Sequence, residues 1–585
     1  MTKSRTGWLW FIAAASPALL PLWLILRDGV NLHFVDEWDP DLAGIYIKAH
    51  LHQLTLADWV CQHNEHRLLV PRLIYFLLAY ATDWNNMADL LCGWAIVCAT
   101  SLGILWLCRR TAAGRSALLL WFICNLLIFT PEQSENWLWG IGVANFLPMA
   151  LFIGAVVAAC WRGPAWLRLA MGVVLAFAAT FSNASGFATW PLVGCLLARP
   201  SSWSQCKTPK SIVLAWIGGF VLTVALYSIH YQRPEIGGYW PRSLGALLGY
   251  NLVFLGNAFG HATSYPPAMS AAVAGAVMMM LLLVAVGYFL FSWRMGRGEL
   301  CNRMLVWLVV AGFSVISSVM AAHGRSGYGL EHAHMSRYVT HAIYLPVALV
   351  NLVPILCEDL RGRMGPRLNA FWIQLPAGLT AVLILMQAMS LPGAISGCHQ
   401  WRVYQTDLKA SLLLINILPD NPKLPLIYPW TGNLFRHANA LNEMGYLHPP
   451  LIASNNAAEI RASDPSQVSG ARGKLDKFLA GSADQITLAG WAIFSRTAQP
   501  ADAVFLTYQN ENQQPIICAQ ADLGLQRDDI VEQTGNADYL SCGWQATVPL
   551  SRLPADIHFI RIKAWALDTD TAKAWPLDDV FSVQR

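Results

Sequence analysis

The sequence has few charged residues for its length. Only 13% of its 585 residues are Asp, Glu, Lys or Arg, about half of the roughly 25% that is usual in soluble globular proteins. Hydrophobic residues make up 55% of the chain, and its mean hydropathy is +0.41. This composition excludes a soluble enzyme and a disordered chain, and it predicts a protein that crosses a membrane several times. The net charge of +4 is too small and too evenly spread to indicate nucleic-acid binding.

Several common site motifs are also missing. The 13 cysteines include no Cys-x-x-Cys pair, so neither a redox motif nor a structural zinc site is predicted. The sequence has no Gly-x-x-x-x-Gly-Lys-Ser/Thr phosphate loop and no His-Glu-x-x-His zinc motif, which removes the usual signs of ATP-driven work and of a zinc protease. Cys518 and Cys542 could pair in an oxidising compartment, and the sequence leaves this open. The 26 tryptophans are typical of membrane interfaces.

Charge-poor runs recur through the first two thirds of the chain. A membrane-spanning helix needs about 20 apolar residues, and on that criterion we predict about eleven spans. They place a transmembrane domain at residues 1–391. The first run is too long for the core of a typical signal peptide, so we expect it to be retained. The predicted spans are 7–27, 89–108, 116–131, 143–161, 166–182, 186–198, 211–231, 268–293, 304–322, 339–357 and 370–391.

The positions of Lys and Arg predict the orientation, because short cytoplasmic loops are enriched in these residues. A cytoplasmic N-terminus puts most basic loop residues on that side and leaves the tail outside. Counting 71–82 or 244–260 as a span would reverse this distribution. We therefore predict two amphipathic helices on the outer membrane surface, the first within a long external loop, 28–88. The basic residues that support this orientation are Lys3, Arg5, Arg109, Arg110, Arg115, Arg162, Arg168, Arg199, Lys207, Lys210, Arg294, Arg297, Arg303, Arg361, Arg363 and Arg367.

The tail has a different composition. Residues 392–480 are mixed in character and contain clusters of proline, which interrupts long helices, so we predict an external connecting region. In 481–585, short runs alternate between apolar and polar residues, as half-buried strands do. We predict an external accessory β-sandwich for this segment. Its expected strands are 486–494, 503–509, 515–521, 544–549 and 560–566.

The densest polar cluster follows the first predicted span. It contains Asp36, Glu37 and Asp39, which this topology places near the outer membrane face. At the rim of a membrane cavity, Asp36 would be suited to act as a general base. A solvated external loop is the alternative interpretation. The three carboxylates could also hold a divalent cation such as Mg²⁺ or Mn²⁺, since hard cations prefer oxygen ligands; no other cofactor is predicted.

Two further clusters carry cationic side chains. His66, Arg67 and Arg72 lie in the first external loop, where they could bind an anion or simply lie at the interface. Arg325 and Arg337 flank a loop that is rich in glycine and hydrogen-bond donors. Two guanidinium groups suit a phosphate, because each offers a fork of donors. The alternative for Arg337 is a side chain that extends from a helix end to the membrane surface.

A fourth cluster combines carboxylates with aromatic rings. It contains Glu132, Glu135, Trp137 and Trp139, and it falls on the predicted external side. These side chains could bind a sugar, with the ring faces stacking on it, and Tyr338 could join them. An aromatic belt at the membrane interface, with polar neighbours, is the alternative.

The order of these features resembles that of a known enzyme superfamily. A retained first span, the Asp36-Glu37 pair, surface helices that include 71–77, and a second span that ends in Arg109-Arg110 are similar to the GT-C superfamily. Its members are integral-membrane glycosyltransferases that use polyprenyl-phosphate sugars. The resemblance is architectural and covers roughly residues 8–390. It implies that Asp36, or Glu37, is the catalytic carboxylate and that Arg337 holds the donor phosphate.

The chemistry of such a transfer follows from the donor. Phosphate is already a good leaving group, so the reaction needs one base for the acceptor hydroxyl and one cation for the departing phosphate. We assign the first task to Asp36 and the second to Arg337, aided by Arg325 or Arg67. Attack from the opposite face would invert the anomeric centre.

These features lead to a specific expectation. We predict a multi-pass protein of the bacterial inner membrane that transfers a sugar to an envelope glycan, lipid or protein at the external face. A flippase for lipid-linked glycans or another transporter is one alternative, and a non-enzymatic envelope assembly protein is another. The sequence does not specify the sugar, the acceptor, the polyprenol or the oligomeric state.

Overall fold

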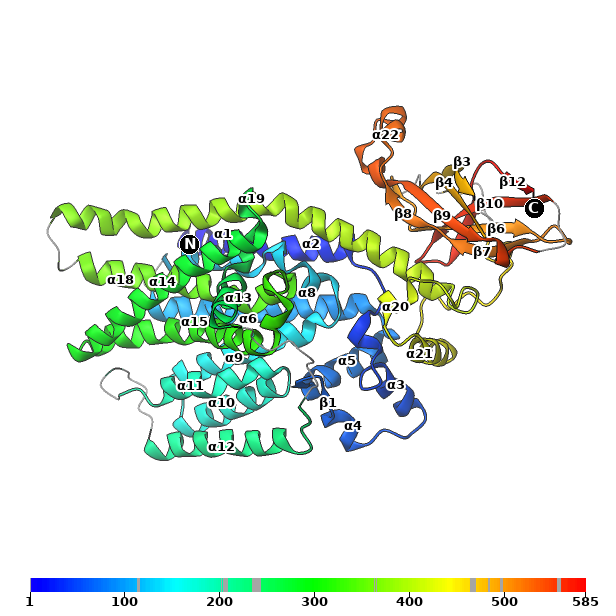
Figure 1. Cartoon of the computed structure of the whole chain (residues 1–585). Coiled ribbons are helices and arrows are strands. Elements are labelled where there is room, and N and C mark those ends of the chain that lie inside the picture. The colour runs from blue at the N-terminus through cyan, green and yellow to red at the C-terminus, as the bar shows by residue number, and fades with distance from the viewer. Residues whose placement is uncertain are drawn as a thin grey trace. The chain divides into compact units, whose positions relative to one another are not determined.

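The computed structural model describes residues 2–112, 116–200, 203, 209–233, 243–361, 363, 366–462, 470–481, 484–494, 498–554 and 559–584. The chain divides into two compact units, whose elements are labelled in Figure 1. Unit 1 consists of Met1–Gly29, Thr55–Leu77 and Met87–Cys398, and unit 2 of Val30–Leu54, Leu78–Asn86 and His399–Arg585. The segment that we expected to form one external loop, 28–88, therefore contributes residues to both units.

Unit 1 is almost entirely helical (Figure 1). Among the described residues, nine stretches are long and apolar enough to cross a membrane, which agrees with the prediction of a multi-pass membrane protein. The nine stretches are Trp8–Asp28, Asn86–Thr111, Ser116–Leu138, Gly142–Cys160, Lys210–Ser228, Pro267–Arg294, Gly298–Tyr328, Ser336–Arg361 and Trp372–Leu413.

The secondary structure of unit 1 includes one short hairpin besides the helices. The helices begin and end as follows: α1 (Thr2–Ala15), α2 (Leu19–Asp28), α4 (Leu56–Val60), α5 (Leu69–Thr82), α6 (Asn86–Thr111), α7 (Ser116–Ile128), α8 (Ser134–Leu138), α9 (Gly142–Cys160), α10 (Ala165–Thr180), α11 (Thr189–Leu197), α12 (Lys210–Ser228), α13 (Leu244–Gly256), α14 (Pro267–Arg294), α15 (Gly298–Arg325), α16 (Leu330–Ala333), α17 (Val339–Ala342), α18 (Tyr344–Arg361) and α19 (Pro366–Leu413). The hairpin consists of β1 (Gln62–His63) and β2 (His66–Arg67). The 3-10 turns are η1 (Ser16–Ala18), η3 (Pro131–Gln133), η4 (Ala184–Ala188), η5 (Asn257–Ala262), η6 (Ser326–Tyr328) and η7 (Ser336–Tyr338).

Two of the predicted spans correspond to shorter helices. The spans expected at 166–182 and 186–198 are the apolar helical segments Ala165–Thr180 and Ala184–Leu197. At about 1.5 Å per residue, helices of this length fall short of a hydrocarbon core of about 30 Å. The described residues therefore contain nine helices that are long and apolar enough to cross a membrane, and eleven spans stay a prediction.

The segment 244–260 differs from its prediction as a helix on the membrane surface. Its helix α13 packs against α14 and α15, and Tyr250 and Phe254 are fully buried. The helix is apolar on all sides, with no distinct polar face, and such a helix is usually buried within a protein or a membrane rather than laid along a surface.

Glycines allow the close contact between α13 and α14. A Cβ atom on Gly256 would lie 1.9 Å from the carbonyl oxygen of Ala271, and one on Gly275 would lie 2.0 Å from that of Leu252. Neither position can hold a larger residue without moving a backbone. Small residues of this kind let membrane helices approach closely, and here they bring the two backbones into direct contact.

The last predicted span continues beyond the end that we expected. Helix α19 runs past residue 391 to Leu413, with Pro376 and Pro392 inside it. Its residues up to Cys398 belong to unit 1 and the following ones to unit 2. Proline removes one backbone hydrogen bond and bends a helix, but in membrane helices neighbouring groups compensate for this loss. The proline-rich composition of 392–480 therefore did not indicate where the helix ends.

Unit 2 contains the β-rich C-terminal region (Figure 1). One five-stranded sheet has the order β11-β10-β6-β7 with β12 on β10, and the other has the order β3-β4-β9-β8 with β5 on β4. The strand pairs are antiparallel. The elements of unit 2 include η2 (Val35–Trp38), α3 (Ala43–His50), α20 (Leu424–Ile427), α21 (Thr431–Glu443), α22 (Asp528–Thr534), η8 (Ala537–Ser541), η9 (Leu550–Arg552), β3 (Ala471–Gly481), β4 (Gln485–Phe494), β5 (Gln499–Pro500), β6 (Ala503–Gln509), β7 (Pro515–Gln520), β8 (Asp522–Leu525), β9 (Gly543–Pro549), β10 (Phe559–Asp568), β11 (Lys573–Pro576) and β12 (Phe581–Gln584).

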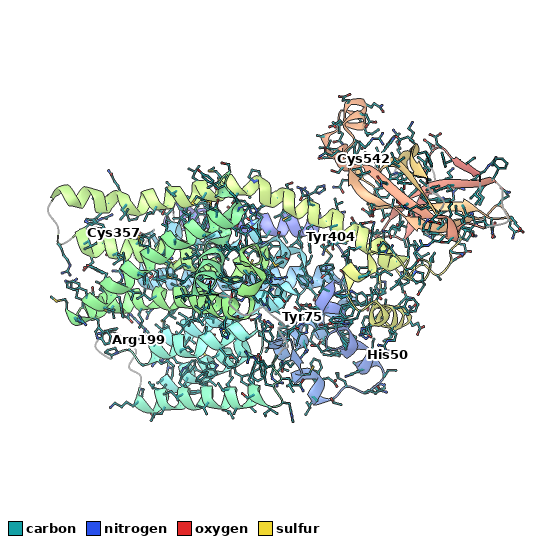
Figure 2. All side chains as sticks on the ribbon, in the orientation of Figure 1. His50, Tyr75, Arg199, Cys357, Tyr404 and Cys542 are labelled. Carbon is teal, nitrogen blue, oxygen red and sulfur yellow. The ribbon has the colours of Figure 1, made fainter. Side chains whose placement is uncertain are left out.

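Alternating residues of both sheets form one hydrophobic cluster, which includes Leu488 and Trp544 from one sheet and Ile562 from the other. A second cluster joins the end of α19 to the outer side of β6 and β10. The two cysteines whose pairing the sequence left open are both free thiols, and Cys542 is labelled in Figure 2.

The contact between α13 and α14 generates a test. We expect Gly275→Ala to lower the stability of the protein by about 1–3 kcal/mol, the usual cost of inserting a group into a packed interior. Gly287→Ala is the matched control, because a Cβ atom there has open space within the same helix. Thermal unfolding of the purified protein in detergent micelles measures both. Equal unfolding midpoints for the two variants would contradict the contact.

Candidate functional site

The described part of unit 1 contains a cavity of about 690 Å³ with both polar and apolar walls. It lies where several elements end: the β1–β2 hairpin, η4, the C-terminal ends of α12 and α15, and η7. Polar and aromatic side chains converge there from segments that are far apart in the sequence. The residues that line it are Glu65, His66, Asn145, Asn183, Ala184, Ser185, Phe187, Tyr227, Ser228, Tyr231, Phe254, Ser317, Val319, Met320, Ala321, His323, Gly324, Arg325, Arg337, Tyr338 and His341.

The hairpin brings Glu65 and His66 to this cavity. Its two-residue turn has Asn64 at a φ of 49°, a left-handed conformation that asparagine tolerates better than most residues. Arg67 fixes the hairpin, because its Nε donates to the carbonyl oxygen of Tyr227 at 2.8 Å and its Nη atoms donate to two further backbone carbonyls. The local sequence thus presents Glu65 at the tip of a short, anchored turn.

Two of the predicted phosphate ligands bind the backbone instead. Arg67 is 5% exposed and Arg72 is 1% exposed, and Arg72 donates to the carbonyl oxygens of Cys61 and Trp59 at 2.7 and 3.2 Å. Neither is among the lining residues of the cavity. In this structure both side chains hold the segment around the hairpin in place, and their predicted role in binding phosphate gains no support.

An ion pair crosses one wall of the cavity. Arg325, at the end of α15, donates from Nη2 to Glu65 Oε1 and from Nη1 to the hydroxyl oxygen of Tyr338 at 2.8 Å. Burial by itself would raise the pKa of Glu65, but the electrostatic interactions with the His66 ring and the Arg325 guanidinium outweigh it and lower this pKa to about 2. Glu65 is therefore ionised near neutral pH, and it is too weakly basic to take a proton from a substrate hydroxyl.

His66 is also occupied within the cavity wall. Its Nδ1 accepts a hydrogen bond from the backbone N–H of Ala184 at 3.1 Å. The neutral ring therefore carries its proton on Nε2, which lies 3.5 Å from Glu65 Oε1. Both ring nitrogens are thus engaged, so His66 positions the hairpin and the carboxylate, and it offers no free lone pair to a substrate.

Arg337 differs from Arg325 because its charge is less fully neutralised. The shortest distance between its guanidinium and a Glu135 oxygen is 3.9 Å, and Nη2 donates to the sulfur of Met335. Its buried Nε has no hydrogen-bond partner among the described residues. The backbone N–H of Arg337 donates to Glu135 Oε2 at 2.8 Å, which fixes the carboxylate. The side chain therefore retains donors and charge for an anion.

The histidine beside the two arginines adds no charge of its own. Burial, together with the charges of Arg337 and Arg325, lowers the pKa of His332 to about 4, so the ring is neutral at pH 7. Tyr250 donates to its Nδ1 at 3.0 Å when that nitrogen is the acceptor. The positive charge on this side of the cavity therefore resides in the two guanidinium groups.

The cluster around Glu132 lies in the protein interior. Trp137 is fully buried and donates from Nε1 to the carbonyl oxygen of Thr130 at 2.9 Å, and Trp139 is 6% exposed. Glu132 Oε2 lies 3.0 Å from His261 Nδ1, and this hydrogen bond raises the pKa of His261. The rings therefore have no open face for a sugar, and their predicted sugar binding gains no support here.

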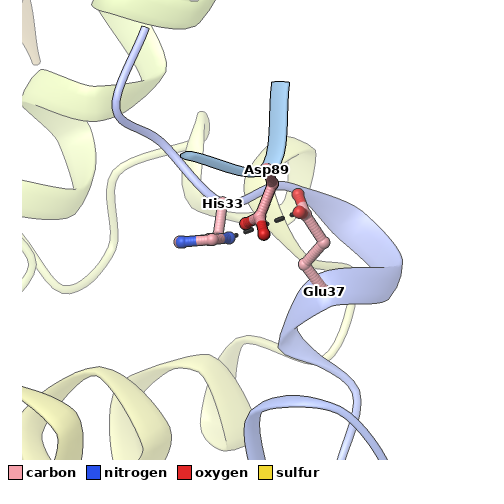
Figure 3. Close-up of side chains that lie close together, drawn as sticks. All are labelled: His33, Glu37 and Asp89. Carbon is pink, nitrogen blue, oxygen red and sulfur yellow. Dashed lines mark hydrogen bonds and ion pairs between the residues drawn. The ribbon is translucent and has the colours of Figure 1, made fainter. Parts of the chain in front are cut away.

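The predicted catalytic carboxylates belong to unit 2. Glu37 is 6% exposed; its Oε2 accepts from the backbone N–H of Phe34 at 2.8 Å, and its Oε1 lies 3.3 Å from His33 Nδ1 (Figure 3). Asp36 is half-buried in the same turn. Glu37 thus has a structural task, which leaves Asp36 as the better of the two candidates for chemistry.

A pair of carboxylates remains near the end of this turn. Asp36 and Asp39 offer oxygens within 4.8 Å of each other, and Asp39 Oδ1 accepts from the hydroxyl of Tyr428 at 2.8 Å. Such oxygens suit a hard divalent cation. Glu37 turns to other partners, so the three-carboxylate set that the sequence suggested reduces to these two, and the cation stays a prediction.

The structure adds residues to the site that the sequence did not single out. Tyr231 follows Tyr227 by four residues at the end of a predicted span, and both side chains line the cavity. The buried His341 also lines the cavity, and its Nε2 lies 3.3 Å from Oγ of Ser185. A tyrosine at a membrane interface is too common to stand out in a sequence, so only the cavity distinguishes these side chains from ordinary interface residues.

No family model matches this chain, and no curated protein matches it either. The similarity to a superfamily drawn from the order of its features therefore stays a prediction. The function is argued below from the geometry of the cavity and from the chemistry of its side chains.

The ion pair at the cavity wall predicts a pH-dependent stability. A lowered pKa means that the ionised Glu65 stabilises the fold above the ordinary pKa of glutamate, and that this stabilisation is lost as the pH falls towards 2. We expect Glu65→Gln to cost about 1–2 kcal/mol at pH 7, after allowance for solvent screening, and clearly less at pH 3. Unfolding midpoints in detergent micelles measure this. Glu331→Gln, at an exposed carboxylate of α16, is the control, and an equal cost of Glu65→Gln at both pH values would contradict the assignment.

Proposed function

We propose that the protein is a membrane glycosyltransferase that moves a sugar from a polyprenyl-phosphate donor to an envelope glycan, lipid or protein. The observation that carries this proposal is the cavity of unit 1. It brings together Arg325, Arg337, His66 and Tyr338, four residues that the sequence assigned to donor or sugar binding from separate clusters. Their chemistry fits an anionic, hydroxyl-rich ligand.

Arg337 is the proposed ligand of the donor phosphate. Its guanidinium retains donors and charge, whereas the charge of Arg325 is balanced by Glu65. As the bond to the sugar breaks, negative charge accumulates on the phosphate, and a fixed guanidinium stabilises this charge without having to reorganise. Arg325 then forms part of the cavity wall and adds to the electrostatic field that favours an anion, and Arg337 contacts the phosphate directly.

The remaining walls suit a sugar. Asn145, Asn183 and Ser185 supply amide and hydroxyl groups for hydrogen bonds, and Tyr231 and Phe187 supply aromatic faces. Pockets for small ligands commonly combine apolar walls with a few polar groups that fix orientation. A volume of about 690 Å³ is in the range of such pockets, about 300–1,000 Å³.

A second cavity supports a lipid-linked donor. It has a volume of about 590 Å³ and lies between α14, α18 and the first part of α19. Its lining is almost entirely aliphatic, with residues such as Val273, Leu281 and Leu383. An apolar void of this kind within the helical unit suits a hydrocarbon chain, and we assign it to the prenyl tail.

Asp36 is the proposed base. Among the groups of the cavity, Glu65 is too acidic for this task and His66 has both nitrogens engaged. In the proposed step, the acceptor oxygen attacks the anomeric carbon while its proton passes to the base. The bond between that carbon and the phosphate oxygen breaks, its electron pair leaves with the phosphate, and the configuration is inverted.

The setting of the reaction belongs to the same proposal. We place the protein in the bacterial inner membrane, with eleven crossings and with the cavity and the C-terminal region on the external side, where envelope acceptors occur. The two sheets of unit 2 then form a β-sandwich that serves as an accessory domain. A divalent cation at Asp36 and Asp39 would help to position the acceptor.

The role of Asp36 is tested by Asp36→Asn, which keeps the size of the side chain and removes its basicity. We expect transfer to fall about 100-fold or more, as is typical when a general base is lost. The measurement is the release of polyprenyl phosphate from a panel of polyprenyl-phosphate sugars in liposomes, with envelope extract as acceptor. Asp41→Asn, five residues further along, is the control and should retain activity. Wild-type transfer by Asp36→Asn would remove the assignment.

The role of Arg337 is tested by two substitutions. A charge-assisted hydrogen bond contributes about 1.5–3 kcal/mol, so we expect Arg337→Gln to lower kcat/KM for the donor by about 10- to 100-fold. Arg337→Lys keeps the charge without the fork and should fall between this variant and the wild type. If both variants matched the wild type in the liposome assay, the phosphate would have to lie elsewhere.

A further inference from the structure

A group of arginines gathers at the end of unit 1 where α6 and α9 finish. Arg110 donates to the carbonyl oxygen of Cys160 at 3.1 Å, and Arg199 donates to that of Ala159 at 3.3 Å. Arg168 reaches the same Ala159 oxygen at 3.5 Å. Three guanidinium groups from α6, α10 and the end of α11 therefore surround the C-terminus of α9.

Two of these side chains are buried. Arg168 is 3% exposed and Arg199 is 9% exposed, and Arg199 is labelled in Figure 2. The Nη1 of Arg199 donates to the amide oxygen of Asn302 at 3.0 Å. Its Nε has no acceptor among the described residues. Carbonyl and amide oxygens supply dipoles but no negative charge, so the hydrogen bonds shown leave the charge of Arg199 without a counterion.

The helices that carry these arginines contain almost no acidic residues. No aspartate or glutamate occurs from residue 90 to residue 131 or from residue 136 to residue 234. These two stretches include almost all of α6 and all of α7, α9, α10, α11 and α12. By contrast, two arginines at the start of α15 have carboxylate partners. Arg297, which precedes the helix, and Arg303 lie 3.3 and 2.6 Å from carboxylates of α18. The excess of positive charge is thus concentrated around the end of α9.

We propose that this group of arginines binds the phosphate headgroup of an anionic membrane lipid. Guanidinium forks match phosphate geometry, and basic pockets between membrane helices are typical headgroup sites. The surroundings favour a lipid over free phosphate, because Trp161 is 39% and Trp166 66% exposed beside the arginines. Exposed tryptophans of this kind lie at the headgroup level of a membrane.

The residues of this site differ from those of the cavity of about 690 Å³. None of its three arginines lines that cavity, so the inference does not depend on the proposed transferase activity. Its function is to hold the ends of α6 and α11 beside the C-terminus of α9, with the lipid phosphate as the counterion of Arg110 and Arg199. The protein should therefore be more stable in membranes that contain anionic lipid.

The test uses the purified full chain in phosphatidylcholine nanodiscs, with and without phosphatidylglycerol. We expect phosphatidylglycerol to raise the unfolding midpoint of the wild type and to remain bound in native mass spectrometry. Arg110→Gln, at an exposed position, and Arg199→Gln should each weaken this binding about tenfold, as for the loss of one charge-assisted hydrogen bond. Arg294→Gln, an exposed arginine at the end of α14, is the matched control and should leave binding unchanged.

The outcomes separate the two sources of phosphate. Inorganic phosphate added to phosphatidylcholine nanodiscs should leave the unfolding midpoint unchanged; the same rise as with phosphatidylglycerol would overturn the lipid assignment. Arg110→Gln decides the matter if Arg199→Gln fails to fold. Wild-type binding by Arg110→Gln, or an equal loss in Arg294→Gln, would overturn the proposed site.

Discussion

The ion pair between Glu65 and Arg325 is the interaction on which the candidate site depends. It joins two residues that are 260 positions apart in the chain, one at the tip of the β1–β2 hairpin and the other at the end of α15. Breaking a partly buried pair costs more than its formation contributes, because one charge is left without a partner. The pair therefore keeps the hairpin closed against the helix, and the cavity wall with it.

This pair also divides the charge of the cavity between its two arginines. Arg325 is neutralised by Glu65 and donates a hydrogen bond to Tyr338, so its side chain stabilises the cavity wall. Arg337 lies 3.9 Å from the nearest carboxylate oxygen of Glu135 and keeps a buried Nε without a partner among the described residues. An anion entering the cavity therefore meets one accessible positive charge, and the same pair makes Glu65 too acidic to act as the base.

Helix α15 connects the cavity with the opposite, basic end of the unit. Its 28 residues span about 42 Å at 1.5 Å per residue. Near its start, Arg303 donates from Nε to the carbonyl oxygen of Thr111 at the end of α6, and Arg325 lies at its other end. Carboxylates neutralise the arginines of α15 at both ends. Around the end of α9, Arg110 and Arg199 donate to carbonyl oxygens, and the hydrogen bonds shown pair neither of them with a carboxylate.

The sequence by itself determined the broad organisation of the protein. A membrane-spanning helix and a half-buried strand each have a local pattern, so the multi-pass helical part and the β-rich C-terminal region could both be predicted from runs of hydropathy and from alternation. The polar clusters were also visible, since charged residues are rare in this chain. The role of each residue in these clusters was not visible, because Arg67, Arg72, Arg325 and Arg337 all look alike in the sequence as residues of predicted external loops.

Only the tertiary structure decided between their roles. Arg67 supports the fold, because its Nε and both Nη atoms donate to backbone carbonyls. Arg337 lines the cavity and remains available for a ligand. In the same way, packing placed Trp137 in the core and α13 against α14. Burial and ion pairing depend on which distant segments meet. No local sequence pattern contains that information.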